Sequence, residues 1–159
     1  FGFTITTPVV NYYEHSTYLT VNHGHTALLG TYGFLALGLL LFSLRGLVKP
    51  EAWKDKWLKV SFFGINVGLF LMFAGTLLPV GILQLVDSFR YGLWHARSPE
   101  FYNQPFVHWI GQVRMLPDTI IIVCGVVPLV LFAAKAFLNL KPVQVADGAA
   151  WPEPPAKSE

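Results

Sequence analysis

Charged residues are scarce in this chain, and their scarcity excludes an ordinary soluble domain. Asp, Glu, Lys and Arg make up 13% of the 159 residues, whereas soluble domains average about 25%. The formal net charge of +2 is too small to predict a nucleic-acid partner, because such partners select strongly basic surfaces. Hydrophobic residues make up 53% of the sequence, so much of the chain is suited to an apolar environment.

Cysteine is nearly absent, and this excludes an intrachain disulfide. The one cysteine, Cys124, lies within an apolar run. Zinc-binding, P-loop, dinucleotide-binding and catalytic-triad patterns are missing as well. The sequence starts at Phe1 with no charged segment or cleavage signal ahead of the first helix, so we expect a piece of a longer polypeptide or a processed chain.

Three long apolar runs account for the hydrophobic excess. Each holds about the 20 apolar residues that a helix needs to cross the hydrocarbon core of a bilayer, so we expect transmembrane helices at residues 17–47, 57–86 and 118–140. The predicted fold class is an all-α membrane protein. Residues 1–16 mix aromatic and polar side chains around Pro8, which suits a lead-in at the membrane surface. Residues 141–159 predict a disordered tail.

The two connections between these helices differ in composition. Residues 45–59 carry five basic and two acidic side chains, so the positive-inside rule places this loop and the C-terminus in the cytoplasm. Residues 87–117 form a periplasmic connection rich in aromatic side chains that suit the membrane interface. We expect His95 and His108, in the same connection, to be interfacial histidines.

The first apolar helix carries Asn22-His23-Gly24-His25 near its periplasmic end. Histidine in a membrane helix is costly unless partnered and therefore indicates function. Because each helical residue turns by about 100°, the two imidazoles point about 200° apart and cannot grip one metal ion. Haem iron commonly takes a histidine as axial ligand, so one helix between two haems is the economical interpretation. Hydrogen-bonded packing histidines or a proton relay are the alternatives.

Two residues near the expected start of the third helix are also candidates. Pro117-Asp118-Thr119 is typical of a helix start, with Asp118 as the N-cap or a first-turn acid. Arg114 lies just before it, and arginine pairs in bidentate fashion with carboxylates such as the propionates of a haem. No Cys-x-x-Cys-His sequence is present, so a haem here is expected to bind without covalent attachment.

The segment from Asn11 to Leu28 reads NYYEHSTYLTVNHGHTAL. It resembles helix ten of the haem–copper oxidase superfamily and, more narrowly, that of the respiratory nitric oxide reductases of the single-subunit, quinol-dependent type. The resemblance extends over about residues 10–140 and corresponds to the last three transmembrane helices of a larger helix bundle.

The resemblance implies a role for each candidate residue. His23 corresponds to the proximal ligand of the high-spin haem b3 at the catalytic centre, and His25 to an axial ligand of the low-spin haem b. Arg114 resembles a propionate partner. Asp118 stands where the family has a quinol-binding acid, although this chain reads Leu-Pro-Asp where relatives often read Pro-Gly-Asp.

The implied reaction is the reduction of two NO to N2O and water with electrons from quinol, in the bacterial inner membrane. The family's non-haem iron is held by three histidines and a glutamate from earlier helices, so the implied partners include the remaining helices of the same enzyme, besides quinol, NO and the bilayer. We therefore expect no activity from this chain alone. The alternatives are an oxygen-reducing haem–copper terminal oxidase subunit, a cytochrome c-dependent nitric oxide reductase, or a non-enzymatic membrane scaffold.

Overall fold

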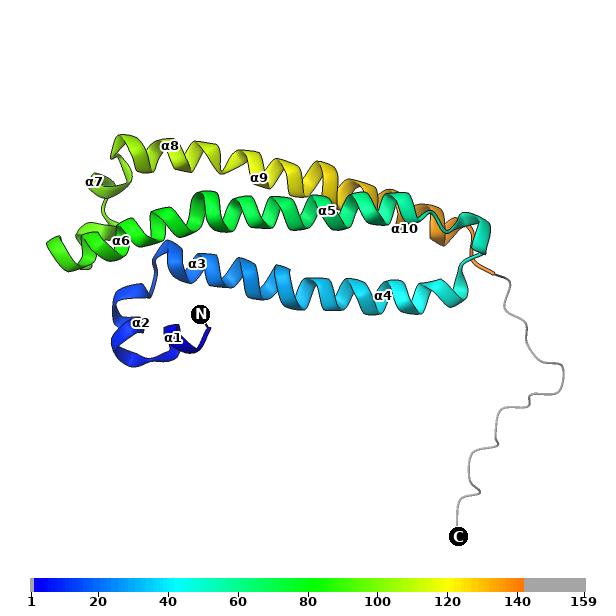
Figure 1. The fold of residues 1–159 in the computed structure, drawn as a ribbon, viewed down its shortest axis with the longest axis horizontal. Helices are drawn as coiled ribbons and strands as arrows, with labels where there is room; N and C mark the ends of the chain where they lie inside the picture. The colour runs from blue at the N-terminus through cyan, green and yellow to red at the C-terminus, as the bar shows by residue number, and fades with distance from the viewer. Residues whose placement is uncertain (1, 142–159) are drawn as a thin grey trace, which may run out of the picture.

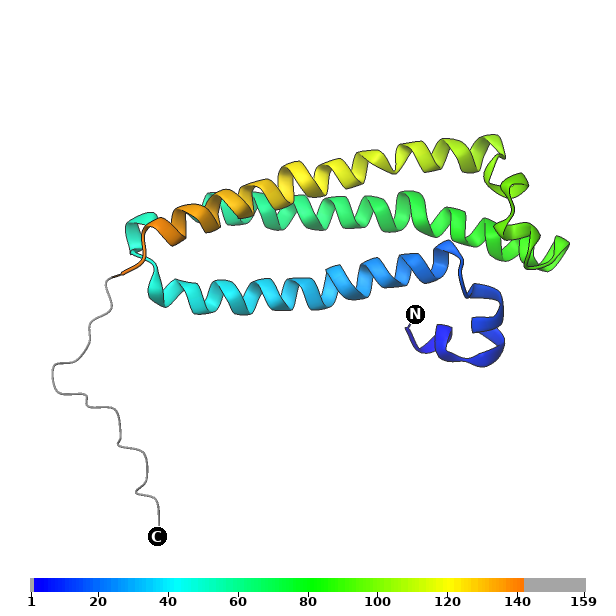
Figure 2. The same ribbon diagram turned by 180° about the vertical axis from the view of Figure 1, so that it is seen from behind.

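A computed structural model describes residues 2–141, and the regular structure of these residues is helical apart from one antiparallel bridge between Val48 and Leu140. Three long helices run side by side (Figures 1 and 2). They cover Tyr18–Leu47, Asp55–Tyr91 and Pro105–Leu138, and each is long and apolar enough to cross a membrane. The prediction of an all-α membrane fold with three spans is confirmed. The predicted tail, residues 141–159, lies outside the described residues except for Lys141.

Each span is built from several consecutive helical segments. The first contains α3 (Tyr18–Gly24), η1 (His25–Gly33) and α4 (Phe34–Leu47). The second contains α5 (Asp55–Met72), η3 (Phe73–Leu77) and α6 (Leu78–Tyr91). The third contains α8 (Pro105–Val113), α9 (Met115–Ile120), η5 (Ile121–Val126) and α10 (Val127–Leu138). Shorter helices are α1 (Gly2–Thr6), α2 (Pro8–Glu14), η2 (Pro50–Ala52), η4 (His95–Arg97) and α7 (Pro99–Tyr102).

The third span begins at Pro105 rather than at Asp118, so the connection before it is shorter than predicted. Pro105 stands in the first turn, where the missing N–H of proline costs nothing. Val107 and Ile110 are buried against Val80 and Phe101, and this packing holds α8 as a helix. The apolar spacing of this segment is helical, but its aromatic and polar content suggested a loop.

Asp118 is not the N-cap of the third span. Arg114 takes the N-cap position of α9, and Asp118 lies in the first turn of that helix. In the lead-in, Pro8 also lies in a helix, since it stands in the first turn of α2. Pro8 therefore starts a helix, whereas Pro117 lies inside α9.

Two wide π-helical turns have a simple cause. The segment η3 ends two residues before Pro79, and η5 ends two residues before Pro128. Proline has no N–H to donate, and its ring collides with the carbonyl four residues earlier, so the helix widens ahead of it. The wide turn η1 in the first span has no proline after it and needs another cause.

Glycines bring the second and third spans into backbone contact. A Cβ added at Gly64 would lie 2.5 Å from the carbonyl carbon of Cys124, and one added at Gly125 would lie 2.5 Å from Cγ1 of Ile65. Gly68 makes a similarly close approach to Ile121. Gly64 and Gly68, one turn apart on the second span, therefore form the contact, whereas nothing lies near a Cβ added at Gly75.

Candidate functional site

His23 and His25 leave opposite sides of the first span. Gly24 (φ −55°, ψ −50°) and His25 (φ −64°, ψ −43°) keep right-handed helical dihedrals, so the two side chains differ in direction by about 200°. Both histidines are half-buried. The geometry lets each imidazole serve a separate centre on its own side of the helix.

The ring of His25 has a fixed orientation. Its Nδ1 lies 2.9 Å from the backbone carbonyl oxygen of Val21. A carbonyl oxygen only accepts hydrogen bonds, so Nδ1 carries the proton and Nε2 keeps its lone pair. Histidines that bind metals usually donate their other ring N–H in this way. His25 therefore fits the requirements of an axial haem ligand.

Side-chain donors also explain the wide turn that begins at His25. Oγ1 of Thr26 donates to the carbonyl oxygens of Asn22 at 2.9 Å and His23 at 3.1 Å. Nδ1 of the His25 ring donates to the carbonyl oxygen of Val21. Three successive carbonyls thus receive side-chain hydrogen bonds, which compete with the normal helical ones. Wide turns of this kind are frequent at functional sites.

The ring of His23 lies against α1. A Cβ added at Gly2 would lie 3.1 Å from Cε1 and 3.2 Å from Nε2 of His23, so α1 covers the Nε2 side of this ring. Figures 1 and 2 both show the N-terminal segment beside α3. A haem bound through Nε2 of His23 fits only if residues 2–6 lie elsewhere.

Asn22, next to His23, is fully buried with an unpartnered amide. Its side chain is 1% exposed, and neither Oδ1 nor Nδ2 has a hydrogen-bond partner within residues 2–141. An unpaired buried amide costs roughly 1–3 kcal/mol. Such a group is satisfied by a further polar group or a buried water.

Gln84 fixes the start of the helix that carries the histidines. This residue is fully buried in α6, and its Oε1 accepts a hydrogen bond from the backbone N–H of Tyr18 at 2.7 Å. Its Nε2 donates to the carbonyl oxygen of Ala96 and to the hydroxyl of Tyr102, both at 2.9 Å. Gln84 therefore joins the first span, the second span and the connection before the third.

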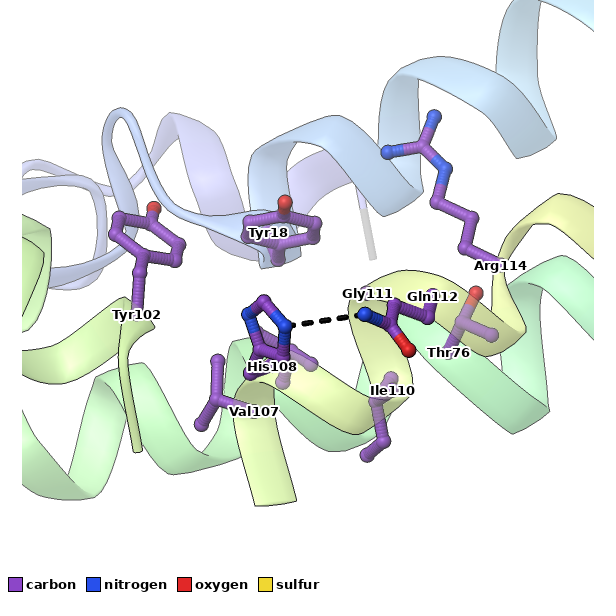
Figure 3. Close-up of a pocket in the computed structure, with 10 residues that line it drawn as sticks. Tyr18, Thr76, Tyr102, Val107, His108, Ile110, Gly111, Gln112 and Arg114 are labelled. Atoms are coloured by element: carbon purple, nitrogen blue, oxygen red, sulfur yellow. Dashed lines mark hydrogen bonds between the residues drawn. The ribbon is translucent and has the colours of Figure 1, made fainter. Parts of the chain in front are cut away.

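A cavity of about 230 Å³ lies beside this junction, between α3, η3 and α8 (Figure 3). Tyr18, Tyr102, His108 and Arg114 contribute polar groups to its wall. Nε2 of His108 lies 3.1 Å from Nε2 of Gln112, which donates to it. Burial raises the pKa of the Tyr102 phenol, so this hydroxyl stays neutral and keeps its proton.

Arg114 and Asp118 come together in the structure. Nε of Arg114 lies 3.7 Å from Oδ2 of Asp118, one helical turn away, and has no hydrogen-bond partner within residues 2–141. Both side chains are partly exposed, so the pair is weak and either member can exchange partners. Their separation of four residues was a sequence signal for this pairing.

Other polar residues at this end of the bundle make structural contacts. Nδ1 of His95 lies 2.6 Å from Oδ2 of the buried Asp87, and its ring packs on Tyr91 with centroids 5.0 Å apart. Arg97 donates to the carbonyl oxygens of Leu93 and His15 and so ties α2 to η4. These contacts occupy the guanidinium group of Arg97.

Sequence reasoning missed three buried polar residues at this end of the bundle. They are Glu14, Asn22 and Gln84. The available signal for Asn22 and Gln84 was a polar side chain inside an apolar run. No three His, Cys, Asp or Glu side chains of the described residues converge on a position for a metal ion.

Comparison with known proteins agrees with the superfamily resemblance. Residues 1–120 match the family model described as Cytochrome C and Quinol oxidase polypeptide I. The match covers more than half of the chain and includes His23, His25, Arg114 and Asp118. No curated protein matches the chain. The helical fold, the three apolar spans and this match assign the chain to the haem–copper oxidase subunit I family, a family of multi-pass membrane oxidoreductases that bind haem.

Proposed function

We propose that this chain is the haem-binding C-terminal part of a membrane nitric oxide reductase that takes its electrons from quinol. The orientation of His25 is the observation that carries the proposal. Its Nδ1–H is committed to Val21 at 2.9 Å, and this leaves Nε2 as a ligand. The local sequence NYYEHSTYLTVNHGHTAL favours the nitric oxide reductases over other members of the family.

The two histidines hold different haems. His25 is an axial ligand of the low-spin haem b, and His23 is the proximal ligand of the high-spin haem b3. The haems supply the redox chemistry by which two NO, two electrons and two protons become N2O and water. For His23 to take this role in the assembled enzyme, α1 would have to lie away from its Nε2, which it approaches here.

Arg114 and Asp118 have roles beside the haems. Arg114 balances the charge of a haem propionate, and its Nε, which has no hydrogen-bond partner within residues 2–141, is the donor for it. Asp118 accepts a hydrogen bond from a quinol hydroxyl. The 3.7 Å ion pair between them is weak enough to open, so a propionate at Arg114 releases Asp118 for quinol.

The rest of the enzyme completes both sites. The second ligand of haem b and the ligands of the non-haem iron come from helices outside this chain. In this arrangement the basic loop of residues 45–59 faces the cytoplasm, and the histidines lie near the periplasmic side of a bacterial inner membrane.

Metal analysis together with donor specificity tests the proposal in the assembled enzyme. We expect iron without copper, and NO reduction with a quinol as sole electron donor. Copper at one per complex would instead identify an oxygen-reducing oxidase. Turnover with reduced cytochrome c but not with quinol would identify the cytochrome c-dependent type of nitric oxide reductase.

A further inference from the structure

A lengthwise groove lies between the second and third spans, at the end of the bundle opposite Gln84. It has a volume of about 650 Å³ and is lined on the α5 side by Lys56, Lys59, Val60, Phe63 and Val67. Ile120 of α9 forms part of the opposite wall. The groove is open to the outside along its length, so a long, flexible molecule can lie in it.

The floor of the groove is fixed by the backbone. Gly64 touches Cys124 so closely that a Cβ added at Gly64 would lie 2.8 Å from the Cβ of Cys124. The helices therefore meet at the floor, while the walls stand clear of each other. Phe63 is 62% exposed and Val67 is 49% exposed, so both present apolar surface to whatever fills the groove.

The end of the groove at the start of α5 is positively charged. Lys56 and Lys59 lie on the same face of α5 as Val60, Phe63 and Val67, at helical spacings of three, four and seven residues. Neither ammonium group makes a hydrogen bond or an ion pair within residues 2–141. The neighbouring acid, Asp55, accepts a hydrogen bond from Nε1 of Trp53 at 2.9 Å.

We propose that this groove binds one anionic phospholipid. Its phosphate lies between Lys56 and Lys59, and one acyl chain runs over Val60 and Val67 toward Ile120. From Lys56 to Val67 the helix rises by about 16 Å, close to the roughly 15 Å depth of one leaflet. Basic pockets between membrane helices suit such lipid head groups, since lysines extend their ammonium groups to the membrane surface.

The charge pattern favours a lipid over another protein helix. A protein helix packed in the groove would bury the side chains of Lys56 and Lys59. It would therefore need acidic side chains opposite these two lysines to balance their charge. A phospholipid supplies an anionic head and an apolar tail in the order that the groove presents. Lipid binding in this groove is independent of which haem or substrate the enzyme uses.

Native mass spectrometry of the assembled enzyme tests the site. The probe is an equimolar mixture of phosphatidylglycerol and phosphatidylcholine, and the readout is the number of each lipid retained per complex. We expect one retained phosphatidylglycerol, reduced at least tenfold by the double substitution K56Q/K59Q. The matched control, K49Q/K54Q, removes the same charge from the connection just before α5, outside the groove, and we expect less than a twofold change.

A second variant separates the groove from general charge attraction. V67W fills the apolar part without changing charge and is expected to lower retention at least tenfold. In the unsubstituted enzyme, phosphatidylglycerol with a photoreactive acyl chain should label the peptide that contains Phe63 and Val67. Equal losses in the two double variants, no loss in V67W, or labelling confined to other peptides would each overturn the proposal.

Discussion

The backbone N–H of Tyr18 donates a 2.7 Å hydrogen bond to the side chain of Gln84, and this contact sets the position of the helix that carries His23 and His25. Tyr18 is the first residue of α3, so its N–H is one of the four that a helix leaves without an internal partner. Gly81, one turn before Gln84, leaves space for Leu19 to lie against the α6 backbone. The second span thus determines the register of the first.

Replacing Gln84 with Leu should destabilise the assembled protein by roughly 1–3 kcal/mol. The substitution keeps similar volume but leaves the N–H of Tyr18, the carbonyl of Ala96 and the hydroxyl of Tyr102 without this partner. Denaturation followed by circular dichroism measures the loss. Gln112→Leu, at an exposed position on α8, serves as control with an expected change below about 0.5 kcal/mol. Equal stability of the two variants would show that the Gln84 junction is unimportant.

Substitution of Gly64 by Ala should separate the second and third spans. The new Cβ would lie 2.5 Å from the carbonyl carbon of Cys124, so the helices must move apart at a cost of about 1–3 kcal/mol. Gly38→Ala is the matched control, because nothing lies within 4 Å of a Cβ at that position. Detergent-induced unfolding compares the two variants. A Gly64→Ala protein as stable as the control would contradict the observed packing.

Burial of Glu14 should make the free energy of unfolding decrease as the pH rises. This carboxyl group is buried, its Oε2 has no hydrogen-bond partner within the described residues, and burial raises its pKa above the usual 4.5. The folded protein therefore holds the proton at pH values where the unfolded chain has released it. Stability should fall as pH rises above 4.5 through the raised pKa.

Glu14→Gln keeps the neutral, buried form at every pH. Thermal unfolding between about pH 5 and pH 8 should show a smaller loss of stability with rising pH than in the unsubstituted protein. At neutral pH the variant should be the more stable of the two. If Glu14→Gln is instead destabilising at neutral pH, Glu14 is an ionised group with a partner in the assembled enzyme.

Asp118→Asn tests the proposed quinol contact. If Asp118 accepts a hydrogen bond from quinol, the variant should raise the KM for quinol about tenfold, the effect of roughly 1.4 kcal/mol, while the haem spectrum stays unchanged. Arg114→Lys retains the positive charge beside Asp118 and should affect the KM for quinol less. An unchanged KM in Asp118→Asn would remove this residue from the quinol site.

The sequence was informative where a single physical pattern decides the structure. Apolar length predicted the three spans. The start at Pro105 was missed because the aromatic and polar residues after it are common both in interfacial loops and in amphipathic helices.

The finer structure of the site depends on contacts that no local pattern specifies. The wide turn at His25 arises because the His25 ring and the Thr26 hydroxyl donate hydrogen bonds to backbone carbonyl oxygens. Many helices contain histidine and threonine without such a wide turn. The position of α1 over His23 and the burial of Asn22 depend on how distant segments pack. The pairing of Arg114 with Asp118 followed a spacing rule that could have been applied to the sequence.

The haem spectrum of His25→Ala tests the central claim most directly. The assembled enzyme is purified with the unsubstituted protein and with His108→Ala, an exposed histidine of α8, as controls. If His25 is an axial ligand, the reduced-minus-oxidised spectrum of His25→Ala should lack the low-spin haem b band, while His108→Ala retains it. A complete low-spin band in an assembled His25→Ala enzyme would contradict the account.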